Sequence, residues 1–322
     1  MIFSSKALLL IAARRSGLFK TRARFWEQTE QSDIFASLEQ DEFVLEMANK
    51  IEPEICGADF ATGVVSYADE DFPCIPVAVK NKGERPYLFL YRGNISLLER
   101  PNNNVAVIGV TNPSDRIIQR EQEIVRNLVN HGVVIVSGLA TGCDTVAHDA
   151  CLAAGGKTIA WLPSTLQKIF PKENQDLADR IVAGGGLLIT EYSQEAESRS
   201  EAINRFIERD RLQAMFSKSV ILIASYRQKE GDSGSRHAME AAKKYGIARY
   251  VMFNSLLDAN DPQFGLNQDI LTKSNQITTK ITDQQSPVQI LPGNYAEEIT
   301  KLQVKEQGKQ DNLPRGEQMT LF

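Results

Sequence analysis

The sequence predicts a protein of the α/β class, with a parallel sheet covered by helices on both faces. Two observations support this prediction. From residue 105 onward, short apolar runs alternate with longer segments of helical periodicity, as in chains that wind strand, helix and strand into one sheet. The strand candidates are apolar throughout, which is typical of strands buried on both faces. The 322 residues suffice for one large domain with appendages or for two domains.

The beginning of the chain predicts a small helical domain ahead of the sheet. Over the first 50 residues, apolar side chains recur at spacings of three and four, separated by polar residues. We assign this helical region to residues 1–70. Arginines and lysines at positions 14, 15, 20, 22 and 24 make it basic, which fits either a solvated helix face or a surface for a polyanion such as DNA.

Residues 51–85 contain several prolines and glycines, so we interpret them as a linker with short elements. Residues 87–91 form a strand candidate that ends in the turn Arg92-Gly93-Asn94. The main domain is predicted to span residues 71–255. Its strands are predicted at 105–108, 133–136, 158–162, 187–190, 220–223 and 250–253, and its helices at 114–130, 142–154, 173–183, 202–216 and 235–245. This pattern predicts a Rossmann-like layered fold, in which ligands bind beyond the carboxyl ends of the strands.

Residues 256–322 form a polar extension without clear periodicity. We see no membrane-spanning stretch, because the apolar run at residues 7–13 is far too short. The four cysteines form no CxxC pair, which favours a reducing compartment, and we expect a cytoplasmic protein. The formal net charge of −5 means that any site for nucleic acid must be a local basic patch.

The strand candidate at 133–136 leads into a turn with Gly138 and Gly142 and then into a helix. Free N–H groups and the positive end of the helix dipole make such a turn a candidate phosphate site. A plain strand-to-helix connection without a ligand explains the same pattern. Asp144 and His148 share one helix face, which fits an acid–base pair, half a metal site or a structural network; we favour the network and expect no catalytic residue, metal or cofactor.

The order of residues from Ser137 to His148 closely resembles the signature SGLAxGxDxxAH of the DprA/Smf family. The resemblance extends from about Tyr91 to Phe253, roughly half of the chain. It implies a non-enzymatic protein that binds single-stranded DNA and delivers it to a RecA-type recombinase, in DNA uptake (natural transformation) or recombination. A homodimer is expected as well.

Three further segments resemble family motifs. The segment Phe170-Pro171-Lys172-Glu173-Asn174 presents an aromatic residue beside lysine; a base could stack on Phe170, but we favour an anchoring role for this ring. Residues 203–217 resemble FPxRNRIIAGLS, with Asp210 where asparagine is usual. Residues 199–229 carry seven basic against three acidic side chains, the best basic patch of the main domain. Residues 231–237 resemble the family's SG[TA] turn. By contrast, Gly109-Val110-Thr111 lacks the arginine of the family's Gly-Ser-Arg pattern.

Together these segments give the predicted DNA- and phosphate-binding residues: Ser137, Gly138, Gly142, Lys172, Arg205, Arg209, Arg211, Ser233, Gly234 and Ser235.

The chain ends in Gln-Met-Thr-Leu-Phe, which looks like the bacterial sliding-clamp-binding peptide. Gln318 would supply hydrogen bonds, while Leu321 and Phe322 would fill an apolar pocket. We therefore expect a sliding clamp as a further partner.

Two other functions fit the fold. One is a phosphoribohydrolase-like enzyme acting on nucleoside monophosphates, against which stands Ala238, where that enzyme motif needs a glutamate. The other is a nucleotide-sensing module, for example in phage defence. The sequence favours the DNA-binding protein over both.

Overall fold

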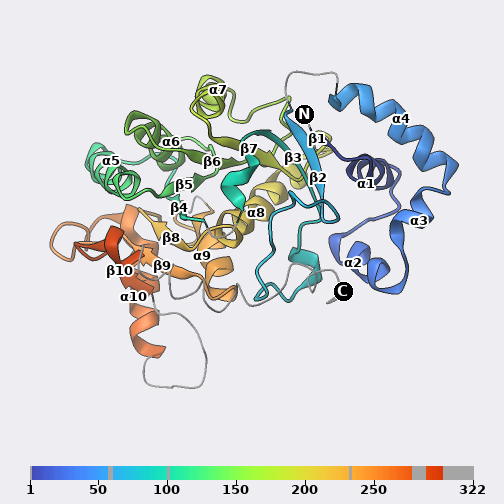
Figure 1. The fold of residues 1–322 in the computed structure, drawn as a ribbon. Helices are drawn as coiled ribbons and strands as arrows, with labels where there is room; N and C mark the ends of the chain where they lie inside the picture. The colour runs from blue at the N-terminus through green and yellow to red at the C-terminus, as the bar shows by residue number, and fades with distance from the viewer. Residues whose placement is uncertain (1, 57–60, 100–101, 232–233, 278–287, 300–322) are drawn as a thin grey trace.

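The structure, a computed structural model, describes residues 2–56, 61–99, 102–231, 234–277 and 288–299. Its centre is a sheet of ten described strands in the order β1-β2-β3-β7-β6-β5-β4-β8-β9-β10 (Figure 1). The strands are β1 (Ile2–Phe3), β2 (Gly63–Ser66), β3 (Leu88–Gly93), β4 (Asn104–Ile108), β5 (Val134–Ser137), β6 (Thr158–Trp161), β7 (Leu187–Thr190), β8 (Ser219–Leu222), β9 (Ala248–Val251) and β10 (Val288–Ile290). β3 runs antiparallel to both of its neighbours, and the other pairings are parallel.

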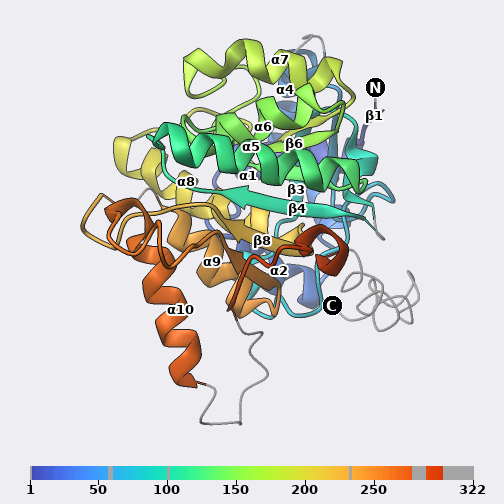
Figure 2. The ribbon, with the colours of Figure 1, turned by 90° about the vertical axis from the view of Figure 1, so that its left-hand side faces the viewer.

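Helices cover both faces of this sheet, as predicted. α5 (Asp115–Asn130), α6 (Cys143–Ala153) and α7 (Gln175–Ala183) lie on one face, and α8 (Arg199–Met215) and α9 (Ser235–Lys244) lie on the other (Figure 2). The two-residue period of a strand explains how one segment supplies both layers. In β4, Val105 and Val107 pack toward α5, whereas Ala106 and Ile108 pack toward α8 and α9. The predicted Rossmann-like fold is confirmed, with strand and helix ends within a few residues of prediction.

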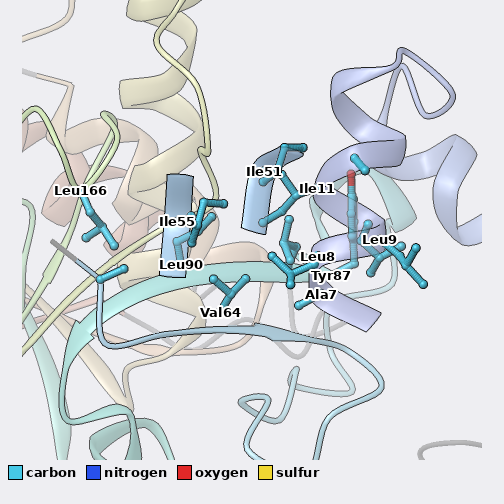
Figure 3. Packing of buried hydrophobic residues seen from close by; sticks show 14 of the residues in the cluster. Ala7, Leu8, Leu9, Ile11, Ile51, Ile55, Val64, Tyr87, Leu90 and Leu166 are labelled. Atoms are coloured by element: carbon cyan, nitrogen blue, oxygen red, sulfur yellow. The ribbon is translucent and has the colours of Figure 1, made fainter. Parts of the chain in front are cut away.

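The predicted N-terminal helices are present as α1 (Ser5–Arg15), α2 (Arg22–Gln31), α3 (Ile34–Leu38) and α4 (Glu42–Cys56). They do not stand apart from the sheet. Figure 3 shows Leu8 of α1 and Ile51 of α4 converging on Val64 of β2 and Leu90 of β3, in the apolar cluster that also receives α7. Strands β1 and β2 of this region join the sheet itself, so the segment interpreted as a linker contributes a strand and buried side chains.

Two tryptophans mark these two parts of the core. Trp26 of α2 is buried and donates its indole N–H to the carbonyl of Arg85 at 3.0 Å. Trp161 of β6 is buried on the α8 side of the sheet, where it stacks on Phe216 with ring centroids 5.1 Å apart.

The region after β9 is more ordered than its sequence suggests. α10 (Gly265–Ile277) packs Leu266 onto the α8 side, β10 adds a strand to the sheet edge, and Tyr295, Ala296 and Ile299 are buried near α5. The stretch interpreted as a polar extension thus contributes a helix, an edge strand and buried side chains. Its few apolar anchors are separated by long polar stretches, so no periodicity reveals them.

The sheet changes direction of growth at β4. Strands β5, β6 and β7 follow one another away from one side of β4, whereas β8 and β9 lie on its other side. The connections leaving the carboxyl ends of β4 and β8 therefore turn to opposite faces of the sheet, which creates the position where open α/β sheets bind ligands. No helix within the described ranges is long and apolar enough to cross a membrane.

Candidate functional site

The loop between β5 and α6 is held from within by Asp144. Its Oδ2 accepts hydrogen bonds from the backbone N–H of Gly138 at 3.1 Å and of Ala140 at 3.3 Å. Ser137, at the end of β5, is buried and donates its hydroxyl to the carbonyl of Val107 at 2.7 Å. The prediction that Ser137 and Gly138 present these groups to a phosphate is not supported by this arrangement, because the groups already have partners.

Arg209 reaches this loop from α8. Its Nη1 lies 3.4 Å from Asp144 Oδ2, and its Nε lies 3.4 Å from Asp210 Oδ1. A Cβ atom on Gly138 would come within 0.9 Å of the same Nη1, so only glycine leaves room for the guanidinium. Arg209 is 4% exposed, which places it beneath the loop and not on its outer surface. The carboxylate of Asp210, which replaces the usual asparagine, is thus paired with an arginine.

Asn174 holds the loop from another direction. Its amide donates to the carbonyl oxygens of Leu139 at 2.8 Å and Ala140 at 3.3 Å, and to Thr145 Oγ1 at 2.9 Å. Leu139 has a φ of 60°, a strained conformation for a branched side chain that the surrounding contacts must maintain. Asn174 is the last residue of the segment that carries Phe170 and Lys172, so its hydrogen bonds connect this segment to the glycine-bearing loop.

The start of α6 is closely covered. Gly142 has a φ of 79°, and a Cβ there would lie 2.4 Å from the carbonyl oxygen of Val110. The N–H of Cys143 donates to that same carbonyl at 3.0 Å. Ser235, at the start of α9, donates its hydroxyl to the carbonyl oxygen of Gly109 at 3.0 Å. Gly142 and Ser235 thus pack the loop after β4 between two helix starts.

Asp144 and His148 are both buried and bonded to their own chain, Asp144 to the loop amides and His148 to Thr158, which fits the structural role favoured from the sequence. Thr158 donates its hydroxyl to the carbonyl of Ile135, so its 2.7 Å contact with His148 Nδ1 makes that nitrogen the donor. Burial, with the nearby Arg209 guanidinium, lowers the pKa of His148 to about 3. Burial also raises the pKa of Glu121 well above its usual value, in the layer beneath the same loop. An imidazole with a pKa of about 3, as in His148, stays neutral and is unsuited to proton transfer at neutral pH.

The other predicted arginines point into the protein. Arg211 donates to both carboxylate oxygens of Glu191, at 2.9 and 2.8 Å, and Arg22 of α2 lies 3.6 Å from the same carboxylate. Arg205 pairs with Glu201 at 2.7 Å and stacks over the ring of Tyr192 at 4.2 Å. Neither geometry supports the predicted contact with phosphate, because both guanidinium groups are buried among partners of their own chain.

The positive charges of the basic patch predicted on residues 199–229 are therefore largely paired with carboxylates of the same chain. Arg24 of α2 stays exposed, but two arginines of α1 are engaged in the same way: Arg14 donates to the carbonyl of Glu191, and Arg15 donates to that of Ser193 and pairs with Glu54. The interpretation of that end as a DNA-touching surface loses these side chains.

Phe170 is the exposed feature that the sequence interpretation assigned wrongly. We favoured it as an anchor in the core, but its side chain is 53% exposed and meets Phe206 edge-on, with centroids 5.7 Å apart. Its neighbour Ile169 is the buried anchor. Ile203 and Ile207 of α8 add exposed apolar surface, at 54% and 40%. Lys172 is exposed, and Lys168, 3.4 Å from Glu195, is exposed as well. The sequence signal for an exposed binding role was the position of this aromatic ring two residues from a lysine on either side.

The remaining predicted residues are partly outside the described ranges. Gly234 has a φ of 88°, and Asp210 Oδ2 lies 3.6 Å from the position of a Cβ there. Ser233 and the terminal residues Gln318, Leu321 and Phe322 lie outside the described residues. Their assignments stay predictions.

A family model described as DNA recombination-mediator protein A matches residues 63–288, which include the whole loop cluster above. The chain belongs to this family. Among similar curated proteins, DNA processing protein DprA of Streptococcus pneumoniae is 34% identical over 185 residues, covering 58% of this chain and 62% of that protein. Protein Smf of Synechocystis is 29% identical over 238 residues, covering 70% of this chain and 57% of its own. The chain thus spans about three fifths of the length of these two relatives.

Solved structures of the family share the fold. The X-ray structure of DprA from S. pneumoniae superposes with a TM-score of 0.61 and 27% identity, covering 84% of this chain and 94% of that one. A structure of DNA processing protein A from Helicobacter pylori, which describes a unique single-stranded DNA binding mode of that protein, gives a TM-score of 0.56 and 26% identity, covering 76% and 96%.

Proposed function

We propose that the protein binds single-stranded DNA at the carboxyl rim of the sheet, as a DNA-processing protein of recombination and without enzymatic activity. The observation that carries this proposal is the exposed Phe170 between Lys168 and Lys172, on a segment tied by Asn174 to the glycine-bearing loop. Stacking of a base on an aromatic ring beside a cation for the phosphate is how single strands are bound without sequence preference. Kinship with DprA proteins, one of them a single-stranded DNA binder, supports the same conclusion.

The proposal relies on fewer cations than the sequence suggested. Lys172 of the predicted set stays a proposed phosphate contact because it is exposed. Gly142, Gly234 and Ser235 stay proposed DNA- and phosphate-binding residues beside it. With few phosphate contacts, affinity should depend on stacking more than on charge, and the salt dependence should be shallow.

The test is a titration of labelled single-stranded and duplex DNA at several salt concentrations, followed by fluorescence anisotropy. We expect Phe170→Ala to weaken single-strand binding by about 1–3 kcal/mol, the range measured for one stacked base. Phe43→Ala is the matched control, since Phe43 is 60% exposed on α4, far from the rim in sequence and fold. Equal affinity for duplex and single strands, or equal loss in both variants, would contradict the proposal.

We propose further that the bound strand is delivered to a RecA-type recombinase and that the protein acts as a homodimer, in DNA uptake or recombination. A strand-exchange assay with a recombinase and a single-strand-binding protein tests delivery. We expect the wild-type protein to shorten the lag before filament growth and Phe170→Ala to lose this effect. Light scattering at two protein concentrations tests the dimer; a monomer mass at both would exclude it.

A sliding clamp is the proposed partner of the terminal peptide. A synthetic peptide of residues 313–322 should bind a bacterial clamp saturably, and replacing Leu321 and Phe322 with alanine should abolish binding, since these two side chains carry the apolar contact. No binding by the native peptide, while a known clamp peptide binds, would remove this partner.

A further inference from the structure

Asp144 and Arg209 connect the two helix layers across the rim of the sheet. Asp144 belongs to α6 on one face and Arg209 to α8 on the other, yet Nη1 of the arginine lies 3.4 Å from Oδ2 of the aspartate. Both side chains are buried, at 4% exposure for Arg209 and 7% for Asp144. The oxygen that receives the guanidinium is the same one that accepts the N–H groups of Gly138 and Ala140.

The loop backbone rests directly on this pair. The guanidinium fills the space that a side chain at position 138 would need, with Nη1 0.9 Å from the position of a Cβ. On the other side, Asn174 binds the carbonyls of Leu139 and Ala140. The loop is therefore clamped between the Asp144–Arg209 pair and the segment that carries Phe170 and Lys172.

We infer that Arg209 and Asp144 are positioning residues, which fix the glycine-bearing loop and through Asn174 the segment of Phe170 and Lys172, and that Arg209 is not a phosphate contact. This inference rests on the proposed function for its effect on DNA. The basic motif suggests that Arg209 contacts phosphate directly, whereas the structure assigns it to holding the loop in place.

Asp144→Asn separates the two roles. The variant removes a negative charge beside the proposed site, so a purely electrostatic effect would strengthen DNA binding. A positioning role predicts weaker binding, by about tenfold, because a carboxylate that accepts two N–H groups and a guanidinium is lost. Arg209→Ala should weaken binding to a similar degree with no change in the slope of log affinity against log salt, whereas Lys172→Ala should reduce that slope by about 0.7, the value for one phosphate of a single strand.

Hydrogen exchange in the DNA-free protein gives a readout that does not depend on the proposed function. The amides of Gly138 and Ala140 should be protected in the wild type and should exchange at least tenfold faster in Asp144→Asn and in Arg209→Ala. If the wild type fails to bind single strands, the proposed function fails, while the exchange rates still decide the positioning role.

Gly138→Ala keeps every charge and displaces the guanidinium, so it separates the position of Arg209 from its charge; a thermal melt of each variant checks that it is folded. It should reproduce the weaker binding with an unchanged salt slope. A reduced slope in Arg209→Ala together with protected amides would overturn the inference, as would tighter binding by Asp144→Asn.

Discussion

Arg209 and Arg211 lie two residues apart on α8, in one basic motif, and they serve two different regions of the molecule. Successive residues of a helix are rotated by about 100°, so side chains two apart point to different sides. Arg209 turns to the glycine-bearing loop at the rim. Arg211 turns to a buried ion-pair cluster of Glu191, Arg22 and Glu208 that joins α8 to α2.

The two regions differ in how tightly their charges are paired. In the cluster, Nη2 of Arg211 donates to both carboxylate oxygens of Glu191, at 2.9 and 2.8 Å. Burial alone would raise the pKa of Glu191, but the guanidinium groups of Arg211, Arg22 and Arg14 outweigh it and lower the pKa. At the rim, the contacts of Arg209 with Asp144 and Asp210 are 3.4 Å long. The cluster therefore stabilises the fold, whereas the rim shapes a loop.

The largest expected effect is on the cluster. Arg211→Ala leaves Glu191 buried with too few cations, and breaking a buried ion pair by removing one partner costs about 3–5 kcal/mol. Guanidinium unfolding at neutral pH measures this loss. Because the pKa of Glu191 is depressed in the folded protein, its stabilising effect is present above the ordinary value of 4.5 and is lost as the pH falls below it. The difference between wild type and variant should therefore narrow below pH 4.5; a constant difference would contradict the role of Glu191.

His148 of α6 should respond to pH in a different window from Glu191. His148 has a folded pKa of about 3, below its ordinary value of 6.5, so the unfolded chain takes up a proton before the folded protein does. Stability is lost as the pH falls through this window, and at pH 5 the loss from His148 is about 2 kcal/mol relative to high pH. His148→Asn should remove this part of the pH dependence between pH 7 and 5. An unchanged profile in the variant would exclude His148 as its source.

A smaller effect is expected at Arg205, the third arginine of the motif. It pairs with the half-exposed Glu201 and stacks over Tyr192. Arg205→Ala should cost about 1–2 kcal/mol, because the ion pair with a half-exposed partner and the cation–π contact each contribute at most about 1 kcal/mol. The same unfolding experiment measures it. A loss as large as that of Arg211→Ala would erase the contrast between the two sides of α8.

The smallest effect is expected at an exposed pair that belongs to neither region. Arg180 of α7 lies 2.8 Å from Asp149, with both side chains nearly half exposed. Arg180→Ala should change stability by about 1 kcal/mol or less and leave DNA binding unaltered. Its change in stability is the reference against which the losses in Arg205→Ala and Arg211→Ala are compared.

The central fold could be predicted from the sequence because local patterns of apolar residues and glycines define its strands and turns. Runs such as Val134–Ser137 and the glycines after them mark strand and turn without reference to distant residues. β10 was not predicted because a strand of three residues at the sheet edge forms through its pairing with β9, which local sequence does not reveal. The burial of Arg209 and Arg211 was not predicted either, since their partners lie 65 and 20 residues away. Phe170 was misjudged because exposure is decided by the packing of a whole loop.

The two buried indoles give each part of the core its own fluorophore. Trp26 lies among the N-terminal helices and Trp161 in the sheet, and they are the two tryptophans of the whole sequence. Replacing either with phenylalanine leaves emission from the other alone. Comparing the denaturation curves of the two single-tryptophan proteins would reveal whether the helical region and the sheet melt as one cooperative unit or separately.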